Sequence, residues 1–128
     1  MKPAPALLAV LVAAGCSAPT PTFLGRVQTA ECLPFASSRA QETLDGSGMT
    51  VDKAGAVKST EHKKAYYVAI RFHGSGVKDG IGVWATNDLN SGSIFSVDGF
   101  AKEFSDFPQQ EGFSSTDQGA DAAKTCVA

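Results

Sequence analysis

The sequence lacks the features that would place it in several large classes. After the first 15 residues, no stretch approaches the roughly 20 consecutive apolar residues of a membrane-spanning helix, which excludes a polytopic membrane protein. An excess of positive charge is also lacking, because 11 basic and 13 acidic residues give a net charge of −2. No basic stripe with interleaved aromatic residues is present, so nucleic acid is not an expected partner.

Motifs for metal binding and catalysis are also missing. The 3 cysteines show none of the CxxC or CxxH spacings of zinc sites, so we expect no metal and no cofactor. No serine lies in a G-x-S-x-G context. We expect His62, in a charged turn, and His73, at the polar face of a strand end, to be ordinary exposed residues. The sequence therefore predicts no catalytic residue, and a small secreted hydrolase that uses His62 or His73 remains the alternative.

The N-terminus is where the apolar residues gather. Lys2 precedes an apolar run from Ala6 to Ala14, and small residues follow, which is the layout of a secretory signal peptide. The run is too short to span a bilayer as a mature helix. We predict that residues 1–15 are a signal peptide and that the protein is exported.

Directly after this run, Ala13-Ala14-Gly15-Cys16 resembles a lipobox, the recognition sequence of bacterial lipoprotein processing. The resemblance implies that Cys16 becomes the new N-terminus and carries the lipid, so the membrane is a partner through the anchor. Two or three acyl chains would hold the protein stably. Ala13 stands where the pattern favours leucine, and ordinary secretion, with cleavage after Ala14 or near Ala18, stays open.

The remaining two cysteines form an even pair in an oxidising compartment once Cys16 is acylated. We therefore predict a disulfide between Cys32 and Cys126, which would close nearly the whole domain. The chain-entropy model gives a loop of this length about 4–5 kcal/mol of stabilisation. Two free, buried thiols are the alternative.

The mature chain divides into residues 16–25, a lipidated cysteine followed by a Pro/Thr-rich tether, and residues 26–128, a single small domain. Alternating apolar residues predict a strand over residues 66–73, and further strands over 81–86 and 93–97. Residues 49–57 are a candidate fourth strand that Gly55 weakens. The short connections between these strands favour antiparallel neighbours.

Helical patterns lie outside the strands. We expect a short helix with a serine cap over residues 37–44. A second helix over residues 100–107 carries a stripe of phenylalanines and has Asp98 as its cap. A capping box at residues 115–118 predicts a terminal helix. The fold class is therefore a small α+β domain, with an antiparallel meander sheet of three or four strands and two or three short helices.

Two aromatic residues point away from the most apolar stripes of their strands. Trp84 and Tyr67 therefore mark an open face of the sheet that would bind a partner. The alternative is that a further helix covers them.

The segment from residue 66 to 107, with Gly-Val-Trp-Ala-Thr-Asn at 82–87 and Ser-Val-Asp-Gly-Phe-Ala-Lys-Glu-Phe at 96–104, resembles small exported proteins of actinobacteria and their prophages. That group has no established activity, so the resemblance implies no site residues. The leading hypothesis is a non-enzymatic, lipid-anchored cell-envelope protein that binds another envelope component. Besides the hydrolase, an alternative is a prophage-encoded superinfection-exclusion lipoprotein, which blocks incoming phage DNA.

Overall fold

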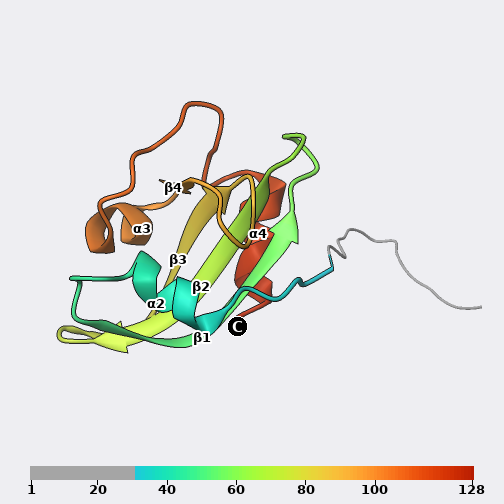
Figure 1. The fold of residues 1–128 in the computed structure, drawn as a ribbon. Coiled ribbons are helices and arrows are strands. Elements are labelled where there is room, and N and C mark those ends of the chain that lie inside the picture. Colours follow the sequence, from blue (N-terminus) through green and yellow to red (C-terminus); the bar gives the residue numbers. More distant parts are fainter. Residues whose placement is uncertain (1–30) are drawn as a thin grey trace, which may run out of the picture.

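The computed structural model describes residues 31–128, so the predicted signal peptide, Cys16 and the tether lie outside the described residues. Four strands form one antiparallel sheet in the order β1-β2-β3-β4, a meander, which confirms the predicted fold class (Figure 1). The strands and helices are β1 (Met49–Lys58), β2 (Tyr66–Gly74), β3 (Val77–Thr86), β4 (Ile94–Ser96), α2 (Ser37–Thr43), α3 (Gly99–Phe104) and α4 (Gln118–Thr125).

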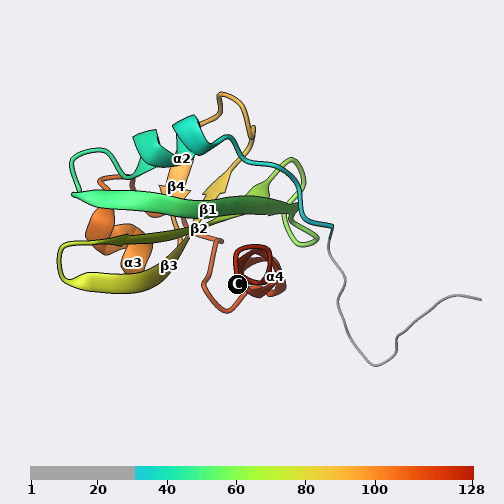
Figure 2. The same ribbon diagram turned by 90° about the horizontal axis from the view of Figure 1, so that it is seen from below.

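Both faces of the sheet are covered. Figure 2 shows α2 and α4 on opposite sides of the strands. On one face, α2 and α3 enclose a cluster that comprises Phe35, Ala40, Leu44, Met49, Ala56, Val68, Ile70, Phe72, Trp84 and Ala101. On the other face, α4 encloses a cluster that comprises Val57, Tyr67, Ala69, Val83, Ala85, Val97, Ala120, Ala123 and Val127. The domain therefore has two small cores that share one sheet.

Strand β3 begins at Val77, earlier than the predicted start at residue 81. The turn consists only of Ser75 and Gly76, between the paired residues Gly74 and Val77, and Gly76 has a φ of 81°. Gly80 and Gly82 belong to the strand, and each lies against an aromatic ring, that of Phe72 or that of Trp84. A Cβ atom at Gly80 would come within 3.1 Å of the Phe72 ring. Glycines that resemble a loop in the sequence are thus strand positions that accommodate aromatic neighbours.

The helix ends differ from the predicted ones. In α3 the Asp98 carboxylate accepts the N–H of Ala101 at 2.9 Å, as the predicted cap requires, but the helix ends at Phe104 rather than at Pro108. The cap of α2 is Ala36, without a side-chain hydrogen bond. The predicted capping box of α4 does not form, because Asp117 is its N-cap residue and its carboxylate bonds elsewhere. No helix among residues 31–128 is long and apolar enough to cross a membrane.

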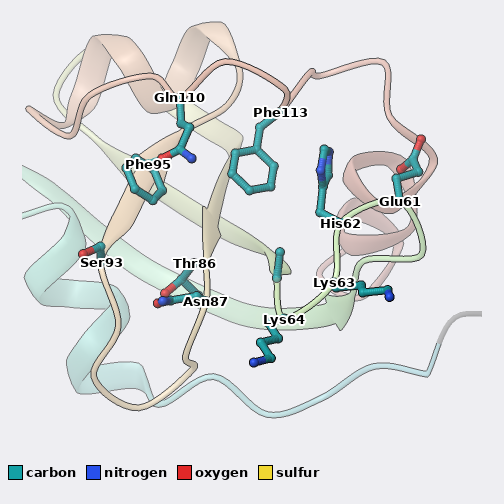
Figure 3. A pocket seen from close by; sticks show the side chains of 11 residues that line it. Glu61, His62, Lys63, Lys64, Thr86, Asn87, Ser93, Phe95, Gln110 and Phe113 are labelled. Carbon is teal, nitrogen blue, oxygen red and sulfur yellow. The ribbon is translucent and has the colours of Figure 1, made fainter.

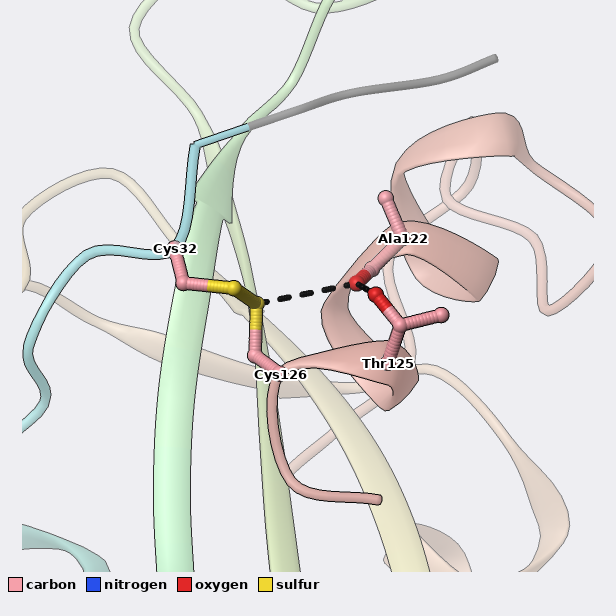
Figure 4. Close-up of a disulfide and its surroundings, with 4 residues drawn as sticks. All are labelled: Cys32, Ala122, Thr125 and Cys126. Atoms are coloured by element: carbon pink, nitrogen blue, oxygen red, sulfur yellow. Dashed lines mark hydrogen bonds between the residues drawn. A yellow bond between two sulfur atoms is a disulfide. The ribbon is translucent and has the colours of Figure 1, made fainter. Parts of the chain in front are cut away.

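The sulfur atoms of Cys32 and Cys126 are 2.11 Å apart, as the predicted disulfide requires (Figure 4). The bond joins the first described residues of the domain to the C-terminal end of α4. Gly55 lies beneath it, and a Cβ atom there would be 3.0 Å from the Cβ of Cys126. The glycine in β1 therefore makes room for the disulfide.

Candidate functional site

Trp84 and Tyr67, the predicted partner-binding residues, are both buried, with exposed fractions of 1% and 0%. They also lie on opposite faces of the sheet, since Trp84 belongs to the cluster under α2 and α3 and Tyr67 to the cluster under α4. The prediction that they form one open binding face is wrong. The alternative, that helices cover them, describes what is found.

Each of these two rings packs against a glycine. The Trp84 ring leans along its own strand, so that a Cβ atom at Gly82 would be 2.8 Å from it, and a Cβ atom at Gly119 of α4 would overlap the Tyr67 ring. The Trp84 indole donates a hydrogen bond to the Ser105 hydroxyl at 3.0 Å. The spacing of Gly82 and Trp84, two residues apart on one face of a strand, is a signal of this packing that is present in the sequence.

A hollow of about 630 Å³ lies beside the start of β2 and the end of β3 (Figure 3). Three segments that are distant in the sequence form its walls: the β1–β2 loop, the β3–β4 connection with the start of β4, and the segment between α3 and α4. The lining residues are Glu61, His62, Lys63, Lys64, Ala65, Thr86, Asn87, Ser93, Phe95, Gln110 and Phe113. Sequence reasoning missed this site because no single segment contains it.

Phe113 is the central ring of the wall. Its centroid lies 4.7 Å from that of His62 and 5.8 Å from that of Tyr67, both in edge-to-face geometry. Phe95 stacks on it at 6.3 Å with an interplanar angle of 23°. Edge-to-face and offset-stacked contacts are the favoured arrangements of aromatic pairs, so the Phe113 ring is held in a defined orientation.

Behind Phe113 lies the Asp117 carboxylate, between Tyr67 of the core and His62 of the hollow. The Tyr67 hydroxyl and the N–H of Ser114 both donate to Asp117 Oδ2, and Nε2 of His62 lies 3.8 Å from the same oxygen. The Tyr67 hydrogen bond lowers the pKa of Asp117 below its usual value. Burial, together with this carboxylate, raises the pKa of Tyr67. Asp117 is therefore ionised at neutral pH, while the phenol stays protonated.

The β1–β2 loop is fixed from within. The Ser59 hydroxyl accepts the N–H groups of Glu61 at 3.1 Å and His62 at 2.9 Å. Lys64 has a φ of 59°, a left-handed conformation that costs a non-glycine residue about 1 kcal/mol or more. His62 is only partly exposed, since 31% of its side chain is accessible and its Nε2 lies 3.8 Å from Asp117.

His73 lies near the opposite end of β2 from the hollow. Its Nδ1 is 2.9 Å from both carboxylate oxygens of Asp52, and both side chains are largely exposed. On the neighbouring strand, Asp79 accepts two hydrogen bonds from Arg71, at 2.7 and 2.8 Å, and the Arg71 guanidinium lowers the pKa of Asp79. The fold therefore does not bring the two histidines together.

Within residues 31–128, no group of three or more His, Cys, Asp or Glu side chains is arranged to hold a metal ion. The chain matches no protein-family model, no curated protein and no solved structure. The hollow and the N-terminal pattern are therefore the two features from which a function is inferred.

Proposed function

We propose that this chain is a non-enzymatic, lipid-anchored protein of the cell envelope, with Cys16 as its lipidated N-terminus and the hollow as the site that binds an envelope component. The hollow replaces the sheet face of Trp84 and Tyr67 in this proposal. Its volume of about 630 Å³ falls within the range of small-molecule sites in proteins.

The observation that carries the proposal is the composition of the rim. Asn87, Ser93 and Gln110 are exposed polar residues of the rim, and each side chain has both donors and acceptors. They surround ordered aromatic rings. A few polar groups around an apolar surface are typical of sites that bind and orient a ligand.

The position of the hollow suits a tethered protein. Leu33 pairs with Ala56 near the C-terminal end of β1, and the loop that follows β1 forms one wall of the hollow. An extended chain spans at most about 3.6 Å per residue, so an anchor at Cys16 would keep Glu31 within about 55 Å of the bilayer. Anchoring would concentrate the site near the membrane.

A matched pair of variants tests this role. Gln110 is an exposed rim residue, and Gln109 is its exposed neighbour that does not line the hollow. Gln110→Trp places a large ring in the site, whereas Gln109→Trp adds the same side chain beside it. Both changes are made in Cys16→Ser, because a lipid anchor would hold every variant to the membrane. In this unlipidated form, we expect sedimentation with envelope material to be lost in Gln110→Trp and kept in Gln109→Trp. Equal sedimentation of both variants would contradict the proposed site.

A second candidate function is the small hydrolase, because a histidine paired with a carboxylate lies in the wall of the hollow, where His62 Nε2 is 3.8 Å from Asp117. An oriented histidine is a candidate general base. Hydrolysis of an envelope substrate that His62→Gln abolishes and His73→Gln preserves would favour this function over the binding protein. Absence of hydrolysis in the unmodified protein, together with envelope binding, would exclude it.

A further inference from the structure

We infer that the hollow binds an acidic saccharide, that is, a sugar ring that carries a carboxylate or phosphate group. This ligand class rests on the proposed binding function and makes it more specific. Three properties of the hollow carry the inference: a fixed aromatic surface, a rim of neutral hydrogen-bonding groups, and an excess of positive charge.

The aromatic surface suits the apolar side of a sugar ring. Phe95 and Phe113 stack on one another, and Phe113 is also held by His62 and Tyr67, so this surface is ordered before any ligand binds. The C–H groups of a pyranose form a flat apolar face that packs on such rings. A preformed surface lowers the entropy cost of binding.

The neutral polar groups suit hydroxyl groups. Gln110 lies beside the two phenylalanines on one side, and Asn87 and Ser93 lie below the rings in the view of Figure 3. Amide and hydroxyl side chains can both donate and accept, as sugar hydroxyls do. These groups come from two different segments, and they therefore surround the aromatic surface instead of forming a single row.

The charge of the rim suits an acid. Lys63 and Lys64 are exposed at the hollow, and Glu61 is the one acidic residue that lines it. The residues that line the hollow therefore carry a net charge of +1 in a chain whose net charge is −2. The ionised Asp117 lies behind Phe113 and already accepts hydrogen bonds from Tyr67 and Ser114. Two lysines form no basic track along which a nucleic acid strand could bind. The open polar rim also disfavours a long acyl chain, which needs an enclosed apolar cavity.

The test compares two oligosaccharides of equal length, one of glucuronic acid and one of glucose, by calorimetric titration of the full chain. Lys63→Gln with Lys64→Gln removes the rim charge. Lys78→Gln with Lys102→Gln removes the same charge from exposed positions in β3 and α3 that do not line the hollow. Gln110→Trp, with Gln109→Trp as its control, reports on the hollow itself.

We expect the glucuronic acid oligosaccharide to bind more tightly than the glucose oligosaccharide. The rim double variant should weaken this binding about tenfold, the distant double variant should not, and Gln110→Trp should abolish it. Equal binding of the two sugars, or equal weakening by both double variants, would overturn the inference. If neither sugar binds but Gln110→Trp in the unlipidated protein still loses envelope sedimentation, the ligand class is wrong and the proposed function stands. If Gln110→Trp keeps that sedimentation, the proposed function itself fails.

Discussion

Tyr67 links the core to the wall of the hollow. Its ring packs against Gly119 of α4, and its hydroxyl donates to the Asp117 carboxylate, which lies 3.8 Å from His62. Burial of the ring therefore determines where the carboxylate and the imidazole lie. The sequence places Tyr67 on a predicted binding surface, but in the structure it is buried and supports the hollow from inside.

Substitution of the glycine beneath Tyr67 tests this packing. We expect Gly119→Ala to lower the free energy of unfolding by about 1–3 kcal/mol, because the added Cβ overlaps the Tyr67 ring. Gly99→Ala is the control, since a Cβ atom at Gly99 has nothing within 4 Å. Urea denaturation of both variants measures the difference. Equal stability of the two variants would contradict the packing described.

The Asp117 network predicts a dependence of stability on pH. The folded state lowers the pKa of Asp117 below its usual value of 3.8. Its contribution to stability is therefore present above that pH and is lost as the pH falls through the folded-state pKa. We expect the free energy of unfolding of Asp117→Asn to fall less steeply below about pH 4 than that of the unmodified protein. The free energy of unfolding is measured by urea denaturation at several pH values. An equal fall in both proteins would contradict the lowered pKa of Asp117.

At the scale of helices and strands, the sheet protects both of its edges. The Gln41 side chain of α2 donates to the carbonyl of Met49 at 2.9 Å and accepts the N–H of Val51 at 3.1 Å, so it pairs with the outer edge of β1. On the other edge, the N–H of Ser96 donates to the carbonyl of Pro108. Covered edges discourage pairing with other chains, which favours the hollow over strand addition as the binding site.

The sequence predicts the strands well where apolar residues alternate, as in residues 66–73. The prediction fails for the start of β3, because Gly76 and Gly80 indicate a longer loop unless the Phe72 ring above Gly80 is known. The burial of Trp84 is not predicted, because the alternation within a strand does not reveal that α3, later in the chain, covers it. The hollow is unpredictable for a related reason, since it exists only where three separate segments meet.

Loss of the disulfide affects the element that carries Asp117. The bond closes a sequence separation of 94 residues, so its removal frees a long loop in the unfolded chain. We expect Cys32→Ser with Cys126→Ser to lose about 4 kcal/mol of stability. A reductant should lower the urea midpoint of the unmodified protein to the same value. An unchanged midpoint in both experiments would contradict the cross-link.

At the scale of the whole molecule, a disulfide-bonded domain with a hollow in its surface follows a segment that resembles a lipoprotein leader. The proposed mechanism is concentration of a binding site near the membrane, and it requires the lipid. The Pro/Thr-rich segment before the domain would then act as a spacer, with the disulfide securing the start of the domain.

Metabolic labelling with palmitate tests the anchor most directly. The account predicts that label enters the unmodified protein when it is produced in a bacterium that processes lipoproteins, and that Cys16→Ser incorporates none. Cys32→Ser with Cys126→Ser is the control, and it should incorporate label as the unmodified protein does. An absence of label in the unmodified protein, or its retention in Cys16→Ser, would contradict the account.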